Sequence, residues 1–174
     1  MTAGSSLVIR PATRADAPVL LELIRGLAEY ERLSHLVTAD APLLERELFA
    51  PGANAEAVIG FAGGEPVGFA VYFHNFSTFL GRRGLYLEDL FVQPAHRRHG
   101  YGRALLRHVA RIAHERGCGR FEWMALDWNA PAIGFYTALG AVEMAEWRLF
   151  RVTGEALARL AAEANSGSSG SFEE

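Results

Sequence analysis

The chain has 174 residues, of which 50% are hydrophobic and 11% aromatic, so it is the size of one domain and has enough apolar residues to bury a core. Seventeen basic and twenty acidic residues give a formal charge of -3, which offers no support for bulk attraction to nucleic acid or to an anionic membrane. No apolar run reaches the roughly 18 residues that a membrane-spanning helix needs, so a transmembrane function is excluded.

Hydrophobic periodicity and the positions of glycine and proline predict helices and strands that alternate along the chain. Thr13 and Asp16 both fit the cap of the first helix, and Gly63-Gly64 fits a hairpin turn. The order of the elements is that of an α/β protein with helices on both faces of a sheet. The predicted elements are a strand at 7–11, a helix ending near 32, a helix at 40–50, strands at 55–62 and 66–74, a loop at 75–84, a strand at 85–92, a helix at 100–116, a strand at 120–126, a helix at 130–139, a strand at 146–152 and a helix at 154–163.

The segment between residues 92 and 103 has the composition of an anion site. It carries Arg97 and Arg98, and two glycines open the long helix that follows. The free N–H groups and partial positive charge of a helix N-terminus favour a phosphate, and glycine lets the backbone approach it closely. The sequence lacks the Gly-Lys-Ser/Thr of a P-loop, and Leu105 argues against a dinucleotide fingerprint. A glycine turn that only connects strand to helix is the structural alternative.

The R-x-x-G-x-G pattern at 97–102, after a strand that ends in Val-x-Pro, resembles the acyl-CoA-binding motif of the GNAT superfamily of N-acetyltransferases. IRPAT at 9–13 and LDWNAPAIGFYTALGA at 126–141 resemble that family's first strand and its later cofactor motif. The resemblance implies a single-domain GNAT fold with a mixed, mostly antiparallel sheet.

LYLEDLFV at 85–92 and AEYE at 28–31 resemble the diamine subgroup of that family, which contains the spermidine/spermine and thialysine acetyltransferases. We therefore expect an N-acetyltransferase domain at 7–163. The Gly/Ser-rich segment at 164–174 is expected to be a flexible tail.

The resemblance implies acetyl-CoA as co-substrate, no metal, and a homodimer. The backbone amides of the turn would bind the CoA pyrophosphate, strand residues would line the pantetheine arm, and the start of a later helix would contact the same arm. Arg98 departs from the family pattern, where glycine is frequent at this position. The expected cofactor-binding residues are Leu90, Phe91, Val92, Arg97, Arg98, His99, Gly100, Tyr101, Gly102, Arg103, Asn129, Ala130, Pro131, Ala132 and Phe135.

Two adjacent acids, Glu88 and Asp89, interrupt an otherwise apolar strand. Because side chains alternate along a strand, Glu88 is expected to share a face with Tyr86 and Leu90, and Asp89 with Phe91. Carboxylates in such a strand must be paired, hydrogen-bonded or functional, and an ion pair with a nearby arginine is the structural alternative. An alkyl ammonium must lose a proton before it can attack a thioester, and a nearby carboxylate can take that proton.

The resemblance assigns this proton-accepting role to Glu88, and substrate contacts to Tyr30, Glu31, Glu88 and Asp89. It assigns to Tyr136 the role of general acid for the departing thiolate, with ordinary packing as the alternative for that side chain.

These features predict a soluble, cytoplasmic enzyme that acetylates a primary amine of a small diamine, polyamine or lysine analogue by direct attack. The N-terminus has no signal-peptide pattern, and the single cysteine, Cys118, excludes an intramolecular disulfide. The alternatives are an acetyltransferase for an amino acid, an antibiotic or a protein N-terminus, and a non-catalytic acyl-CoA sensor. Nucleic-acid binding through the arginines at 97, 98, 103, 107 and 111 is disfavoured by the net charge.

Overall fold

The computed structural model describes residues 6–166 of the chain. The chain divides into two compact units, residues 1–124 and 125–174, and each unit is described by itself. The first contains β1 (Leu7–Pro11), η1 (Arg14–Asp16), α1 (Ala17–Tyr30), η2 (Ser34–Leu36), α2 (Ala41–Phe49), β2 (Ala55–Ala62), β3 (Glu65–Ser77), β4 (Arg82–Val92), η3 (Pro94–His96), α3 (Tyr101–Glu115) and β5 (Phe121–Trp123). The second contains α4 (Ala130–Thr137) and α5 (Gly154–Ser166).

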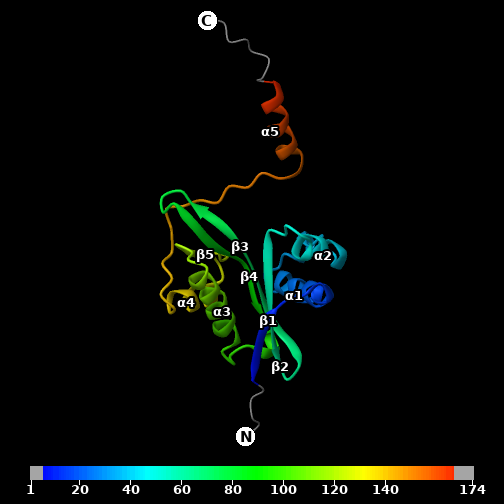
Figure 1. Ribbon diagram of the computed structural model, residues 1–174, viewed down its shortest axis with the longest axis vertical. Helices are drawn as coiled ribbons and strands as arrows, with labels where there is room; N and C mark the ends of the chain where they lie inside the picture. Colours follow the sequence, from blue (N-terminus) through cyan, green and yellow to red (C-terminus); the bar gives the residue numbers. More distant parts are fainter. Residues whose placement is uncertain (1–5, 167–174) are drawn as a thin grey trace, which may run out of the picture. The chain divides into compact units, whose positions relative to one another are not determined.

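The five strands form one sheet in the order β1-β2-β3-β4-β5 (Figure 1). The first four strands pair antiparallel in chain order, and β5 pairs with β4 in parallel. The hairpin between β2 and β3 turns at Gly63 and Gly64, whose φ angles of 61° and 87° favour glycine. The predicted class, an α/β fold with a mixed and mostly antiparallel sheet, is confirmed.

Helices cover both faces of this sheet, as predicted: α1 and α2 lie on one face and α3 on the other (Figure 1). Phe69 and Phe91 are paired across β3 and β4, and both enter a buried cluster with Leu20 of α1. Leu105 of α3 is fully buried on the opposite face, next to Gly68. A side chain on Gly68 would collide with the carbonyl oxygen of Phe91, so this close packing requires glycine.

Both predicted cap residues are N-caps in the structure. Thr13 is the N-cap of the short helix η1, and Asp16 is the N-cap of α1, which follows it. Asp16 accepts hydrogen bonds from the backbone N–H and the hydroxyl of Thr13, both at 2.7 Å, in a capping box around η1. Asp16 is then the N-cap residue of α1, with Pro18 in the first turn. Arg10 of β1 donates two hydrogen bonds of 2.8 Å to the same carboxylate and holds its pKa well below the usual range.

The predicted loop at 75–84 is wrong for most of its length. β3 continues to Ser77 and β4 begins at Arg82, so a four-residue turn joins two long strands. Polar residues and glycines gave this stretch the composition of a loop, but ladder pairing such as that of Asn75 with Gly84 overrides that local preference.

An irregularity in the β3–β4 ladder overturns the predicted alternation around the two acids. Val71 pairs with Asp89 and Tyr72 pairs with Leu87, so Glu88 is an extra residue opposite no partner on β3. Paired residues point to the same side of a sheet. Asp89 therefore shares a face with Tyr86 and Phe91, and Tyr86 does not share one with Leu90. These faces could not be deduced by counting because a bulge shifts the alternation by one residue.

The second unit begins with a capped helix. Asn129 accepts a hydrogen bond from the backbone N–H of Ala132 at 3.3 Å and so caps α4. The predicted strand at 146–152 is wrong, since this segment has no strand in the structure. A strand needs a hydrogen-bonded neighbour, and the described residues of this unit contain no other strand.

The predicted tail overlaps the last three residues of α5, and its residues 167–174 lie outside the described part of the chain. Within residues 6–166, no helix combines the length and the apolar character that crossing a membrane would require.

Candidate active site

The C-terminal half of β4 has an edge that β5 leaves unpaired. The parallel pairing with β5 involves only residues 85–87 of β4, whereas β4 continues to Val92. The two acids and the residues predicted to line a pantetheine arm all follow the last paired residue. Main-chain groups on this edge can therefore pair with an extended ligand, as an added strand would.

The turn after β4 has the geometry of an anion cradle. Gly100, the N-cap residue of α3, has a φ of 80° and contributes no capping side chain. The first N–H groups of an α-helix have no partner within the helix, so those of α3 are directed toward an incoming group. Arg98 and Arg103 are exposed in this turn. Arg98 has a φ of 67°, a conformation that favours glycine, which explains why glycine suits this position in a GNAT motif.

Arg97 and His99 of the same turn make contacts within the protein. The Nε of Arg97 donates to the carbonyl oxygen of Val92 at 3.1 Å, and its guanidinium carbon lies 4.2 Å from the centre of the Tyr30 ring. The Nδ1 of His99 lies 2.9 Å from the carbonyl oxygen of Arg97, and its ring stacks on Tyr101. Both side chains are thus engaged within the protein, whereas Arg98 and Arg103 are exposed, as phosphate contacts would require.

Gly102 offers a clean test of this cradle. A Cβ at this position would meet only the Val92 side chain, at an ordinary 3.8 Å, so the fold tolerates a side chain there. We expect Gly102→Val to weaken CoA binding at least tenfold, about 1.4 kcal/mol, because the side chain would occupy the cradle itself. Calorimetric titration with CoA measures the effect, and an unchanged melting temperature shows that the fold is retained. Wild-type CoA affinity in a folded Gly102→Val would refute the assignment.

Three carboxylates from two elements come together beside the free edge of β4. Glu88 is exposed, whereas Asp89 and Glu31 are half-buried. Burial raises the pKa of Asp89 to about 7, with further contributions from the negative charges of Glu88 and Glu31. Burial also raises the pKa of Glu31. A cation placed among these groups would relieve their mutual repulsion, so the arrangement suits an alkyl ammonium.

The predicted site residues divide between the two units, and those of the second unit lie on α4 or at its N-cap. Tyr30, Glu31, the two acids and the turn all lie in the first unit. Asn129 and the expected arm contacts lie at the start of α4, and Tyr136 lies near its end with its ring centre 5.2 Å from that of Phe135. The side-chain oxygen of Asn129 caps α4. Its backbone N–H donates to the carbonyl oxygen of Leu126, and its own carbonyl oxygen accepts from the backbone N–H groups of Ala132 and Ile133.

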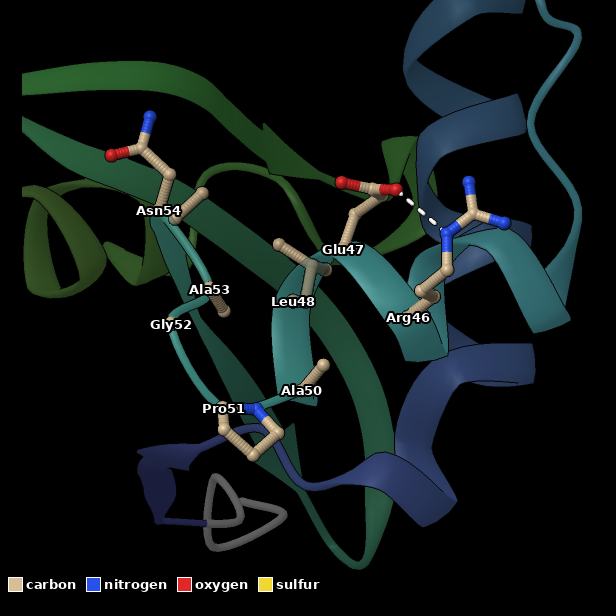
Figure 2. Close-up of a pocket in the computed structure, with 9 residues that line it drawn as sticks. Arg46, Glu47, Leu48, Ala50, Pro51, Gly52, Ala53 and Asn54 are labelled. Carbon is tan, nitrogen blue, oxygen red and sulfur yellow. Dashed lines mark hydrogen bonds and ion pairs between the residues drawn. The ribbon is translucent and has the colours of Figure 1, made fainter.

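Two of the hollows in the described part of the first unit bear on the site. One, of about 460 Å³, lies between α1 and the ends of β3 and β4, and its lining includes Gly26, Tyr30 and Phe91. The other, of about 370 Å³, follows α2 (Figure 2). Its two charged side chains, Arg46 and Glu47, form an ion pair at 2.9 Å, and it contains none of the predicted site residues. The first hollow is therefore the one that adjoins the candidate site.

Comparison with known proteins assigns the family. The acetyltransferase (GNAT) family profile matches residues 22–141, which include the turn, both acids and α4. The chain belongs to the GNAT family of acetyltransferases. Since the match spans both compact units, they are parts of one GNAT domain, and the predicted enzyme class is confirmed.

Several of the similar proteins carry names of the predicted subgroup. The thialysine N-epsilon-acetyltransferase of Sus scrofa is 37% identical over 168 residues, which cover 90% of this chain and 98% of that protein. The L-ornithine N5-acetyltransferase of Arabidopsis thaliana is 34% identical over 201 residues, covering 86% and 85%. Among solved structures, an integron cassette protein from V. cholerae superposes with a TM-score of 0.77 at 26% identity, covering 91% of this chain and 99% of that one.

Two features of this GNAT site were missed by the sequence analysis. Burial raises the pKa of Asp89, and the charge of Glu31, which is 58 positions away in sequence, adds to this rise because the fold brings Glu31 near. The stacking of Arg97 on Tyr30 likewise joins a loop to a distant helix. No local signal in the sequence predicts either contact.

Proposed function

We propose that this GNAT enzyme transfers the acetyl group of acetyl-CoA to a primary amine of a small diamine, polyamine or lysine analogue. The observation that carries the acceptor class is the group of three carboxylates, Glu31, Glu88 and Asp89, beside the free edge of β4. The names of the similar proteins agree, since thialysine and ornithine each have a terminal amine on a flexible side chain.

The residues of the first unit fit the cofactor. Gly100 and Gly102 leave room at the start of α3, and the exposed Arg98 and Arg103 supply positive charge for the pyrophosphate. The edge formed by Leu90, Phe91 and Val92 would pair with the pantetheine arm through main-chain groups. Asn129, Ala130, Pro131, Ala132 and Phe135 are proposed to contact the same arm. When bound, acetyl-CoA supplies the activated acetyl group.

Three protein groups are proposed to move protons. A carboxylate with a pKa near 7 can remove a proton from an acceptor ammonium at physiological pH, and Asp89 has that property. Glu88, exposed on the bulge, would attract the cation and relay the proton through water. Tyr30 and Glu31 would hold the acceptor from the end of α1. The hydroxyl of Tyr136 would donate to the departing sulfur.

A thiol-release assay with acetyl-CoA across a panel of amines tests this proposal. We expect the highest kcat/KM among diamines, polyamines and lysine analogues, and much lower values for aminoglycosides, α-amino groups and peptide N-termini. Preference for one of the latter groups would overturn the proposed acceptor class. CoA binding without acetyl transfer to any amine would point to an acyl-CoA sensor.

We also propose a homodimer. Trp147, Leu149 and Phe150 lie within four positions of the sequence and are 72%, 64% and 85% exposed, and exposed apolar side chains that form one patch mark an interaction site. Light scattering at micromolar concentration should give about twice the 19.0 kDa mass of the chain. Trp147→Ser combined with Phe150→Ser should shift the protein toward the monomer, and a wild-type monomer would contradict the proposal.

A further inference from the structure

Arg97 lies where the cofactor turn meets the end of the first helix. It is half-buried, and its Nε donates to the carbonyl oxygen of Val92, the last residue of β4. Its guanidinium carbon lies 4.2 Å from the ring centre of Tyr30 and 5.8 Å from that of Phe91. A guanidinium at such distances from an aromatic face is attracted by the ring. The side chain thus contacts a strand, a helix and the turn at once.

The helix end that Arg97 contacts carries the acceptor side of the site. Tyr30 is the last residue of α1, and Glu31, which follows it, is close enough to Asp89 to raise the pKa of that carboxyl. The carbonyl groups at a helix C-terminus carry partial negative charge, which favours a cation there. Arg97 therefore contacts this end of α1 through the ring of Tyr30.

We infer that Arg97 is a positioning residue that holds Tyr30 and Glu31 of α1 against the cofactor turn and thereby sets the affinity for the acceptor amine. This inference rests on the proposed function. It separates the arginines of the turn into two classes. Arg98 and Arg103 are exposed and serve the phosphates, whereas Arg97 acts on the acceptor through Tyr30.

The test compares two substitutions in the same turn. Arg97→Gln removes the stacked cation, and Arg103→Gln removes an exposed cation that lacks this stacking. We expect Arg97→Gln to raise the KM for the best amine of the panel at least tenfold while the Kd for CoA, measured by calorimetry, changes less than threefold. Arg103→Gln should do the reverse, weakening CoA binding and leaving the KM for the amine within threefold of wild type. An Arg97→Gln variant that loses CoA affinity tenfold with an unchanged KM for the amine would overturn the inference.

Conservative variants separate positioning from general damage. Tyr30→Phe keeps the ring under the guanidinium, so its loss should be smaller than that of Tyr30→Leu. Arg97→Gln should add little in a Tyr30→Leu background, because the contact is already gone. Full additivity of the two changes in the KM for the amine would count against the contact.

Hydrogen exchange gives a readout that is independent of activity. The amides of Glu31 and Leu33 donate to the carbonyl oxygens of Leu27 and Ala28 at the end of α1. Arg97→Gln should speed exchange in this segment at least fivefold while leaving the centre of α3 unchanged. This result supports the inference even if no amine of the panel is acetylated, and wild-type exchange at the end of α1 would overturn it.

Discussion

Replacing Tyr136 with phenylalanine should lower kcat by about 10²-fold, the usual contribution of a positioned acid. The departing thiolate has a conjugate thiol of pKa near 8.5, and a phenol of pKa about 10 can donate to the sulfur as charge develops. The substitution removes only the hydroxyl. The ring packs beside Phe135, and the carbonyl oxygen of Tyr136 accepts from the amides of Leu139 and Ala141, none of which changes. The fold and the affinity for CoA should therefore be retained.

Single-turnover kinetics measure this effect on the chemical step itself. Tyr72→Phe is a matched control, because Tyr72 is buried, its hydroxyl lies 3.5 Å from the exposed Glu56, and it has no assigned role in catalysis. It should keep wild-type kcat. If Tyr136→Phe also keeps wild-type kcat when chemistry limits the rate, Tyr136 is a packing residue and the sulfur is protonated by another donor or by water.

Asp89→Asn should have opposite effects on activity and on stability. We expect kcat/KM for a diamine to fall by about 10²-fold at pH 7, since the amide cannot accept a proton from the acceptor. The native pKa of Asp89 is about 7, above its ordinary 3.8, so the folded protein keeps a proton that the unfolded chain releases. The free energy of unfolding of the wild type therefore falls as pH rises from about 4 to 7, by about 1.4 kcal/mol per pH unit.

An asparagine side chain does not titrate, so Asp89→Asn removes this fall in the free energy of unfolding. The variant should therefore be stabilised relative to wild type more at pH 8 than at pH 4.5, by at most about 4 kcal/mol. Urea unfolding at the two pH values measures it. A destabilised variant at pH 8 would mean that the ionised carboxylate is satisfied in the native state. Wild-type kcat/KM at every pH from 6 to 9 would remove Asp89 from the proton path.

Glu88→Gln distinguishes the two acids. Because the charge of Glu88 helps to raise the pKa of Asp89, its removal should move the acidic limb of the pH profile of kcat/KM to lower pH. The loss in kcat/KM should be smallest at high pH, where free amine is already abundant. An acidic limb that does not move, together with wild-type kcat/KM, would leave Glu88 without a role in the reaction.

The sequence predicted those parts of the protein that local rules govern. The glycine turn and the amphipathic α3, with Leu105 and Val109 fully buried, follow from turn chemistry and a 3.6-residue period. Predictions from local sequence were wrong where secondary structure depends on pairing with a distant segment. Residues 146–152 have the composition of a strand but no neighbouring strand in the described part of their unit.

The site shows the same division. The motif identifies Arg97 as part of the cofactor turn, but its side-chain direction depends on Tyr30, which is 67 positions earlier in the chain. The sequence shows the two acids. The side of the sheet to which Asp89 points depends on Glu88, which has no partner on β3.

The extra residue in β4 also bears on how such an enzyme can lose its activity in evolution. Removing Glu88 would leave every β3–β4 pair intact, from Gly68 with Val92 to Ser77 with Arg82, because Glu88 itself has no partner on β3. A one-codon deletion would therefore close the ladder without changing which side chains enter the core. The anion cradle would remain and one acid of the acceptor site would be gone. One in-frame mutation would thus alter the acceptor site while keeping the β3–β4 ladder and the cofactor turn, with no change in hydrophobic composition.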